Sequence, residues 1–434
     1  MKDNAFACLF LRLAEKVFVV LSLLFFTDAI LPVLNQVSGI QINSIIKVCF
    51  FVIQTITILL IVAWWKKVFR TVIKEKLLWA VVGIALVSVL WSDAPVTSLV
   101  NSISLLRITL LGVYFAARYS LKEQLQLLVW MFGIAVLLSV VFALALPSYG
   151  VMGVASNSSV EALNHTGAWR GIYIHKNVLG RTMVLSALAF LLFVSSSRRY
   201  RWVGWAGFGL SVGLILLSTS KTALMIFITI VFLFHLYKAL RWNYSLAVPF
   251  FITLLLVSGT VALLFLGNAE TILGAMGRDI TLTGRTELWS AVFDKIWQRP
   301  WLGYGYRGFW RGWEGESADV WSVVKWAAPN SHNGLLDLWL DLGLLGLSAF
   351  VISFIAVCLR AVIWVRLTKT VEGLWPLAYL TFLFLANITE SSLFTQSYLW
   401  LMYVVITLSM TTGVSIRAEP NEFCFSEIQG RSNV

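Results

Sequence analysis

The chain contains 434 residues, of which 59% are hydrophobic and only 12% are charged, and its mean hydropathy is +0.84. Such values exclude an ordinary soluble domain and indicate a polytopic membrane protein. The four cysteines are scattered without paired spacing, which argues against both a disulfide framework and a cysteine metal site. The formal net charge of +12 would suit nucleic-acid binding, but the positions of the basic residues indicate a different reason for it.

Twelve apolar runs approach or exceed the length needed to cross a bilayer, since a spanning helix requires about 20 mostly apolar residues. The predicted spans are residues 17–34, 44–64, 77–91, 99–117, 125–146, 177–195, 202–217, 221–237, 246–266, 334–358, 374–390 and 398–413. The signals over 77–91 and 202–217 are the weakest because these runs are short. We expect an all-α membrane protein with about twelve transmembrane helices, in which residues 1–434 form a single integral membrane domain.

The basic residues are concentrated in alternate connections between these spans. Together with the termini, the connections after the second, fourth, sixth, eighth and tenth spans contain 20 of the 33 lysines and arginines. The short connections 35–43, 92–98 and 389–397 contain none. The positive-inside rule then places the basic connections and both termini in the cytoplasm. The excess charge is therefore a topology signal, and we expect no nucleic-acid partner.

Two longer connections fall on the outer side, at residues 147–176 and 267–333, before the C-terminal spans of region 334–413. Functional residues of membrane proteins gather in such loops, so the function is expected there. Within the longer loop, "LTGRTELWSAVFDKIWQR" has an apolar stripe with helical periodicity, formed by Leu288, Trp289, Val292, Phe293, Ile296 and Trp297. The loop therefore predicts amphipathic helices, and this stripe suits a position along the membrane surface.

Cations on the outer side run against the topological bias and require a separate reason. They include Arg170, Lys176, Arg181, Lys221, Arg285, Arg299, Arg307 and Arg311. Snorkelling of long side chains and ion pairing are the simplest alternatives, because loop 267–333 contains seven acidic and seven basic residues. We favour a functional role for Arg170, Lys221 and Arg285, and one of the simple alternatives for Arg307 and Arg311.

Clustered guanidinium and ammonium groups at a membrane surface suit an anion of fixed shape, above all a diphosphate attached to a lipid. His332 precedes the tenth predicted span and adds a group that titrates near neutral pH, where an imidazole has a pKa of about 6.5. It is a candidate general base for a hydroxyl group. A histidine at a helix start is also often only a capping or interface residue.

A histidine signature and four further sequence blocks occur between residues 169 and 346. His332-Asn333, nine residues and then Gly343-Leu344-Leu345-Gly346 have the form H-N-x9-G-x-x-G. The blocks are "WRGIYIHKNVLG" (169–180), "STSKTAL" (218–224), "TGRTELW" (283–289) and "RPWLGYG" (299–305). In sequence, order and approximate spacing, these motifs resemble those of the bacterial O-antigen ligase and polymerase superfamily. "HKNVLG", "STSKTAL" and "GRTELW" are similar to the exopolysaccharide polymerases of the ExoQ type, named for succinoglycan production.

The resemblance implies a metal-independent, inverting glycosyltransferase with a GT-C-like helical fold and no cofactor. Its donor would be an undecaprenyl-diphosphate-linked glycan, which it would polymerise at the periplasmic face of the bacterial inner membrane. By motif, His332 would deprotonate the acceptor hydroxyl. The residues expected to bind the diphosphate are Arg285, Arg170, Lys221 and Arg181. In place of the Ser-Arg of many members, this chain has Ser220-Lys221, which keeps the charge but loses the bidentate fork.

Four further residues are expected to support this site: Asn333, Asp337, Asp341 and His175. Asp337 and Asp341 are four residues apart and so share one face of the predicted helix, from which they would orient His332 or pair with Arg107. A metal site is not expected at that spacing. The predicted partners are the lipid-linked glycan, membrane lipid, and the chain-length regulator and flippase of the same pathway.

Two other functions remain open. An O-antigen ligase would use the same donor but transfer the glycan to a sugar of the lipid A core. A flippase for lipid-linked oligosaccharides, or another transporter, belongs to a different class and would also have many spans and buried charges. Transporters tend to contain internal repeats, and we find none in the sequence.

Overall fold

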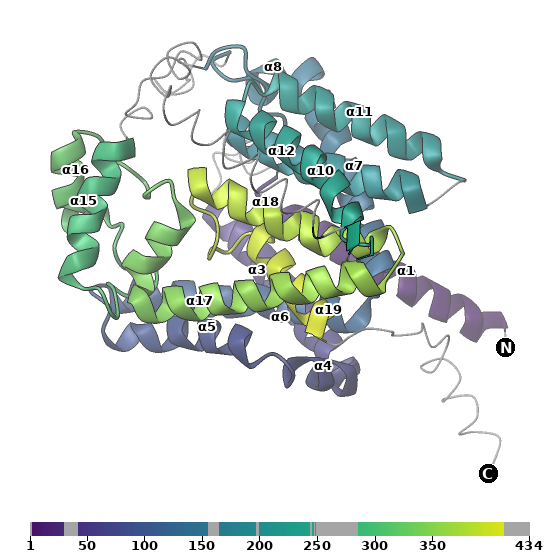
Figure 1. Ribbon diagram of the computed structural model, residues 1–434, viewed down its shortest axis with the longest axis horizontal. Coiled ribbons are helices and arrows are strands. Elements are labelled where there is room, and N and C mark those ends of the chain that lie inside the picture. Colours follow the sequence, from purple (N-terminus) through teal and green to yellow (C-terminus); the bar gives the residue numbers. More distant parts are fainter. Residues whose placement is uncertain are drawn as a thin grey trace. The chain divides into compact units, whose positions relative to one another are not determined.

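The computed structural model describes residues 2–29, 42–154, 165–196, 199–243, 245–246, 248 and 285–411. Apart from one isolated bridge between Val151 and Trp169, the regular elements of these residues are helical. They are α1 (Lys2–Phe25), α3 (Ile42–Ala63), α4 (Trp65–Val72), α5 (Lys76–Val87), η1 (Ser88–Leu90), α6 (Pro95–Arg118), α7 (Leu121–Ala145), α8 (Pro147–Gly150), α10 (Lys176–Ser196), α11 (Arg201–Leu217), α12 (Lys221–Ala239), α15 (Arg285–Gln298), η2 (Gly312–Glu314), α16 (Ser317–Val324), α17 (Gly334–Leu367), η3 (Glu372–Leu374), α18 (Trp375–Thr389) and α19 (Tyr398–Thr411) (Figure 1).

The prediction of an all-α polytopic membrane protein is confirmed. Within the described residues, six helical segments are long and apolar enough to cross a membrane, namely Ile45–Ala63, Pro95–Arg118, Leu121–Ala145, Lys176–Ser196, Lys221–Ala239 and Gly334–Leu367. Shorter apolar helices cover Lys76–Leu90, Arg201–Leu217 and Tyr398–Thr411. The predicted span 246–266 lies almost wholly outside the described residues, so the number of twelve stays a prediction.

Two predicted spans differ in extent from the helices of the structure. The first was expected over 17–34, but α1 begins at Lys2 and ends at Phe25, and the chain then turns through Asp28 at a φ of 61°. The tenth was expected over 334–358, but α17 continues to Leu367 and is interrupted at Gly343. The uninterrupted apolar segment therefore begins after Gly343, and the nine residues before it are too few to cross a bilayer.

The chain forms two compact units. The first comprises Met1–Glu75, Thr109–Phe227 and Leu401–Val434, and the second comprises Lys76–Ile108 and Ile228–Trp400.

In the first unit α10 packs along α11, and both contact α7. Small residues of α11 allow a close approach: a Cβ on Gly204 would lie 2.6 Å from Val194, and one on Gly207 would lie 2.4 Å from Phe190. Small residues are a usual means of packing membrane helices where apolar surface alone gives no advantage over lipid.

In the second unit, α15 and α16 lie side by side and pack on the beginning of α17 (Figure 1). The buried side chains of this part come from α15, α16, the connection between 299 and 310, and α17. They include Leu288, Val292, Ile296, Tyr304, Phe309, Val320, Leu336 and Leu340. The expectation that the apolar stripe of α15 lies along the membrane surface is therefore wrong for Leu288, Val292 and Ile296, which are buried against protein. Phe293 and Trp297 on the same helix remain exposed.

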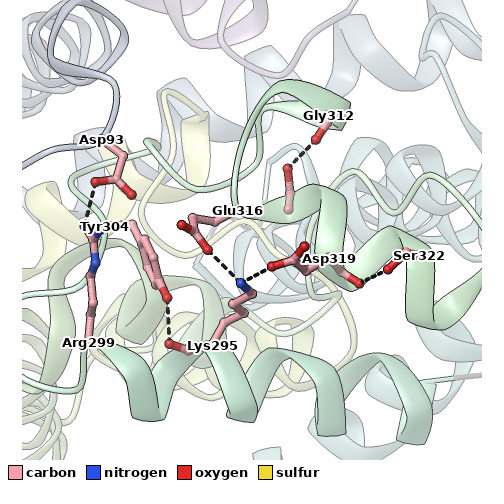
Figure 2. Close-up of polar contacts among 9 residues, drawn as sticks. Asp93, Lys295, Arg299, Tyr304, Gly312, Glu316, Asp319 and Ser322 are labelled. Atoms are coloured by element: carbon pink, nitrogen blue, oxygen red, sulfur yellow. Dashed lines mark hydrogen bonds and ion pairs between the residues drawn. The ribbon is translucent and has the colours of Figure 1, made fainter.

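A buried lysine joins α15 to α16. Lys295 donates from Nζ to Glu316 at 2.6 Å and also forms an ion pair with Asp319 (Figure 2). Burial alone would lower the pKa of Lys295, but the hydrogen bonds that it donates to Asp319 and Glu316 raise the pKa above its ordinary value. At the end of α15, Arg299 pairs with Asp93 at 2.6 Å. These contacts fix α15 and α16 with respect to the loop that follows η1.

The interruption of α17 is held by the "RPWLGYG" block. Gly343 has a φ of 63° and a ψ of −169°, which ends the first helical segment. The amide of Leu344 then donates to the carbonyl of Pro300 at 2.7 Å, and the amide of Tyr304 donates to the carbonyl of Leu340 at 2.8 Å. These bonds satisfy polar groups that the break removes from the helix. Two motifs far apart in the sequence thus meet through their backbones.

We expect Gly343→Ala to destabilise the second unit. An added Cβ would lie 2.2 Å from the backbone carbon and oxygen of Trp301, and the positive φ alone costs about 1–3 kcal/mol for a residue other than glycine. Thermal unfolding in detergent should show a clear loss of stability. Gly83→Ala is the matched control, because a Cβ there meets nothing within 4 Å and alanine favours the helix. Equal stability of the two variants would contradict the backbone contact described above.

Candidate active site

A tight turn positions His332 at the start of α17. Asn333 caps the helix, because its side-chain oxygen accepts hydrogen bonds from the amides of Leu335 at 3.0 Å and Leu336 at 3.3 Å. The hydroxyl of Ser331 donates to the carbonyl of Asn333, and the amide of His332 donates to Asn330 Oδ1 at 2.9 Å. Short polar side chains therefore determine the backbone on both sides of the histidine.

The backbone of His332 itself is strained. Its φ is 53°, a left-handed conformation that residues other than glycine rarely adopt and that costs free energy unless the surroundings impose it. The imidazole is partly exposed and stacks on Trp326, with ring centroids 6.0 Å apart. A strained residue held by neighbouring side chains is a frequent feature of functional sites, which favours more than a capping role for His332.

Helix α15 is attached directly to this turn. The indole nitrogen of Trp289 donates to the carbonyl of Ser331 at 2.9 Å. Arg285 precedes Trp289 by four residues and therefore lies on the same face of α15, about one turn away. This hydrogen bond thus joins α15, which contains Arg285, to the turn that contains His332.

The two aspartates of α17 are buried behind the histidine turn. Asp337 accepts hydrogen bonds from Trp310 Nε1 at 2.9 Å, from the amide of Ser331 at 3.1 Å and from the hydroxyl of Ser391. The partners of Asp337 are thus Trp310, Ser391 and the turn of His332 rather than Arg107, and the expectation that the pair orients His332 stays a prediction. The role of Asp337 in the structure is to hold the turn before His332 against α17 and the loop after α18.

A cavity of about 130 Å³ adjoins these aspartates. It lies within the second unit, between the Pro329–Asn330 turn, the first segment of α17 and the loop after α18. Its lining residues are Arg307, Trp310, Pro329, Asn330, Gly334, Asp337, Leu338, Asp341, Ser391, Phe394 and Thr395. Arg307 lines this cavity. From the sequence, ion pairing or snorkelling was favoured over a functional role for this residue.

The first unit contains the other predicted cations. Arg170 is half-buried and donates from Nε to the carbonyl of Tyr149 at 2.7 Å and from Nη2 to that of Ser148 at 3.4 Å. Burial lowers the pKa of Arg170. Its partners among the described residues are these two carbonyl groups, and no described carboxylate pairs with it. The two backbone contacts use two of the five N–H donors of a guanidinium, so capacity for an anion is left.

The "HKNVLG" and "STSKTAL" blocks meet at the starts of α10 and α12. The hydroxyl of Ser220 donates to Asn177 Oδ1 at 2.9 Å, and a Cβ on Gly180 would lie 2.8 Å from that of Ala223. As a result, Lys176 and Lys221 are electrostatic neighbours. Like charges placed together at helix starts favour binding of an anion, to which helix N-termini also contribute.

His175 and Arg181 have identifiable roles in the same unit. His175 Nδ1 accepts a hydrogen bond from the amide of Asn177 at 3.2 Å, which caps α10, and its ring contacts that of His165. Asp28 is an acidic neighbour of Arg181. This favours charge compensation for Arg181 over diphosphate binding. Because Arg170, His175, Arg181 and Lys221 belong to one unit and Arg285, His332 and the aspartates to the other, a diphosphate site shared between them stays a prediction.

Residues 206–351 match the family described as O-Antigen ligase. A search of known proteins also finds the exopolysaccharide production protein ExoQ of Rhizobium meliloti (strain 1021). It is 25% identical over 274 residues, which are 61% of this chain and 60% of that protein. The predicted resemblance to the O-antigen ligase and polymerase family is confirmed.

The part that matches the O-antigen ligase family includes Lys221, Arg285, His332 and both aspartates of α17. Three residues near the candidate site were not singled out by sequence: Trp289 as a contact of the histidine turn, and Trp310 and Ser391 as partners of Asp337. Trp310 and Ser391 lie 27 and 54 residues from Asp337, so no local pattern relates them to it. Trp289 was predicted only as a member of an apolar stripe.

Proposed function

We propose that this protein polymerises undecaprenyl-diphosphate-linked oligosaccharide repeat units into an exopolysaccharide at the periplasmic face of the bacterial inner membrane. The proposal includes an inverting transfer that needs no metal ion. The observation that carries it is the hydrogen bond from Trp289 to the carbonyl of Ser331, which brings the helix of Arg285 to the turn of His332. This contact supports the proposal because it joins the helix that carries Arg285, the proposed cation for a phosphate, to the turn that carries His332, the proposed base.

In the proposed reaction, His332 accepts the proton of an acceptor sugar hydroxyl, and the hydroxyl oxygen attacks the anomeric carbon of the donor. The bond between that carbon and the diphosphate breaks on the opposite side, which inverts the configuration. The lipid diphosphate leaves with its electron pair, and Arg285, Arg170 and Lys221 stabilise the negative charge. A diphosphate is a good leaving group near neutral pH, so one base and a set of cations are sufficient.

The O-antigen ligase reaction is the second candidate, because the matching family is described by that name. It would use the same donor site and differ in the acceptor, a lipid A core sugar in place of a second lipid-linked repeat unit. The geometry of His332 and Arg285 serves both reactions equally.

An assay with purified protein separates these functions. Lipid-linked repeat units alone should be converted into longer chains that remain on the lipid carrier, as seen by gel electrophoresis. Transfer only after addition of a lipid A core acceptor would identify a ligase. No new glycosidic bond with either acceptor, together with movement of lipid-linked units across proteoliposomes, would instead identify a transporter.

The proposed orientation gives a labelling prediction. Single cysteines at the exposed positions Thr166 and Ser322, in a chain without the four native cysteines, should react with a membrane-impermeant thiol reagent in intact spheroplasts. A cysteine at the partly exposed position Ser196, directly after the sixth predicted span, should react only after lysis. Labelling at 322 but not at 166 would place the two sets of cations on opposite sides of the membrane and would contradict a shared diphosphate site.

A further inference from the structure

The cavity beside the histidine turn has no role in the reaction as proposed so far. Its lining includes Asn330 and Gly334, the residues two positions before and two positions after His332. A ligand bound there would therefore contact the turn that carries the proposed base. The remaining walls come from α17, from Arg307 and Trp310, and from the loop after α18.

One buried acceptor in this cavity has no donor within the described residues. Asp341 is 8% exposed; the amide of Arg307 donates a hydrogen bond to its carboxyl group, but its Oδ1 accepts none within the described residues. Asp337, one turn earlier, is by contrast occupied by Trp310, Ser331 and Ser391. An unsatisfied buried carboxylate oxygen is costly, so a donor that enters the cavity from outside would bind with a substantial gain.

The charges of the cavity decide which class of ligand suits it. Arg307 is the one cation among the residues that line the cavity, where it lies with the acidic residues Asp337 and Asp341. Burial raises the pKa of both carboxyl groups, that of Asp341 to about 8. A diphosphate carries more than one negative charge and would find a single cation here, which separates this cavity from the proposed donor site. Hydroxyl groups of a neutral sugar would instead donate to Asp341 and exchange hydrogen bonds with Asn330 and Thr395, which also line it.

The size of the cavity agrees with a small polyhydroxylated ligand. The volume of about 130 Å³ is several times the roughly 10–15 Å³ that one water molecule needs, so the cavity holds a small number of water molecules. One edge of a sugar ring, with two or three hydroxyl groups, replaces that number of water molecules. The indole of Trp310 is fixed in the wall by its bond to Asp337 and supplies an apolar surface beside the polar groups.

We propose that this cavity is the binding site for one sugar of the acceptor glycan, with Asp341 accepting a hydrogen bond from a sugar hydroxyl. The inference rests on the proposed function and adds to it the residues that hold the acceptor. Asp341 thereby positions the acceptor next to His332, while Asp337 keeps the turn of His332 in place.

The test uses the full chain in detergent and the repeat-unit oligosaccharide released from its lipid by mild acid, which retains acceptor hydroxyls but has no diphosphate. Calorimetric titration should show binding to the wild type and an affinity about 10-fold lower for Asp341→Asn, since the amide nitrogen that replaces one carboxyl oxygen can donate a hydrogen bond but cannot accept one. Thr395→Val should lower the affinity by about 2- to 10-fold. Asp294→Asn, at an exposed position of α15, should bind like the wild type.

Binding of undecaprenyl diphosphate to the same samples shows whether each variant is folded, and it should be unchanged in Asp341→Asn and Thr395→Val. If Asp341→Asn fails this check, Thr395→Val carries the test. Equal oligosaccharide affinity in the folded variants and the wild type, or no binding to an active wild type, would overturn the inference and leave the cavity as a water site. Oligosaccharide binding that depends on Asp341 in a protein unable to lengthen lipid-linked units would retain the pocket and overturn the proposed function.

Discussion

His332→Ala is expected to abolish sugar transfer, with a rate at least about 100-fold below that of the wild type. General base catalysis contributes about 10²- to 10⁴-fold, and the proposed site offers no second base at the histidine turn. The imidazole is partly exposed, so its removal should leave membrane insertion and folding intact. The measurement is the initial rate of chain elongation by purified protein on lipid-linked repeat units.

The strained backbone of His332 requires a matched control. Asparagine adopts a positive φ more readily than alanine, so His332→Asn should be the more stable of the two variants and equally inactive. Added imidazole should restore part of the activity of His332→Ala, which a merely structural role would not predict. Polymer of wild-type length and rate from His332→Asn would remove the residue from the mechanism.

Much of the fold could be predicted because the signals are local. The predicted spans 177–195, 202–217 and 398–413 agree with α10, α11 and α19 to within a few residues, since each apolar run is bounded by polar or basic residues. The start of α17 was also predicted correctly, because Asn333 is a strong helix cap immediately before an apolar run.

Contacts between distant segments could not be predicted in the same way. The apolar run from Leu335 onward gives no sign that the helix stops at Gly343, because the cause is the backbone of Pro300–Tyr304 packed against it. Likewise, the apolar stripe of α15 is compatible both with a helix that lies on a membrane surface and with a helix that packs on protein, because both have the same periodicity. Only the position of α17 distinguishes the two.

The same distinction between local and distant signals applies to the candidate site. His332, Arg285 and Lys221 were predicted from residue type and motif, and their roles in catalysis and diphosphate binding stay predictions. The residues that contact them in the structure were not predicted. Asp337 was expected to orient His332 or to pair with Arg107, and the sequence did not indicate that its contact with the turn is the amide of the preceding residue, Ser331. The acceptor cavity depends on side chains from four separate segments, which no spacing rule relates.

Arg285→Lys is expected to lose transfer activity by about 10-fold or more, although the charge is kept. A guanidinium binds two phosphate oxygens through a planar fork, whereas an ammonium group acts as a point charge, and a hydrogen bond between charged groups contributes about 1.5–3 kcal/mol. Arg285→Ala should lose more, about 10²- to 10³-fold, because charge stabilisation of the leaving diphosphate is lost as well. The elongation assay on lipid-linked repeat units measures both, at saturating and at limiting donor concentration.

Lys221→Arg is the matched comparison, because it adds a fork where this chain has only a point charge, and its activity should equal or exceed that of the wild type. Glu287→Gln tests the competing explanation, in which Arg285 serves only to pair with its neighbour on α15. If pairing were its role, Glu287→Gln would reduce activity as much as Arg285→Lys. Full activity of Arg285→Ala would exclude Arg285 from the diphosphate site, and the cations of the first unit alone would then have to bind the donor.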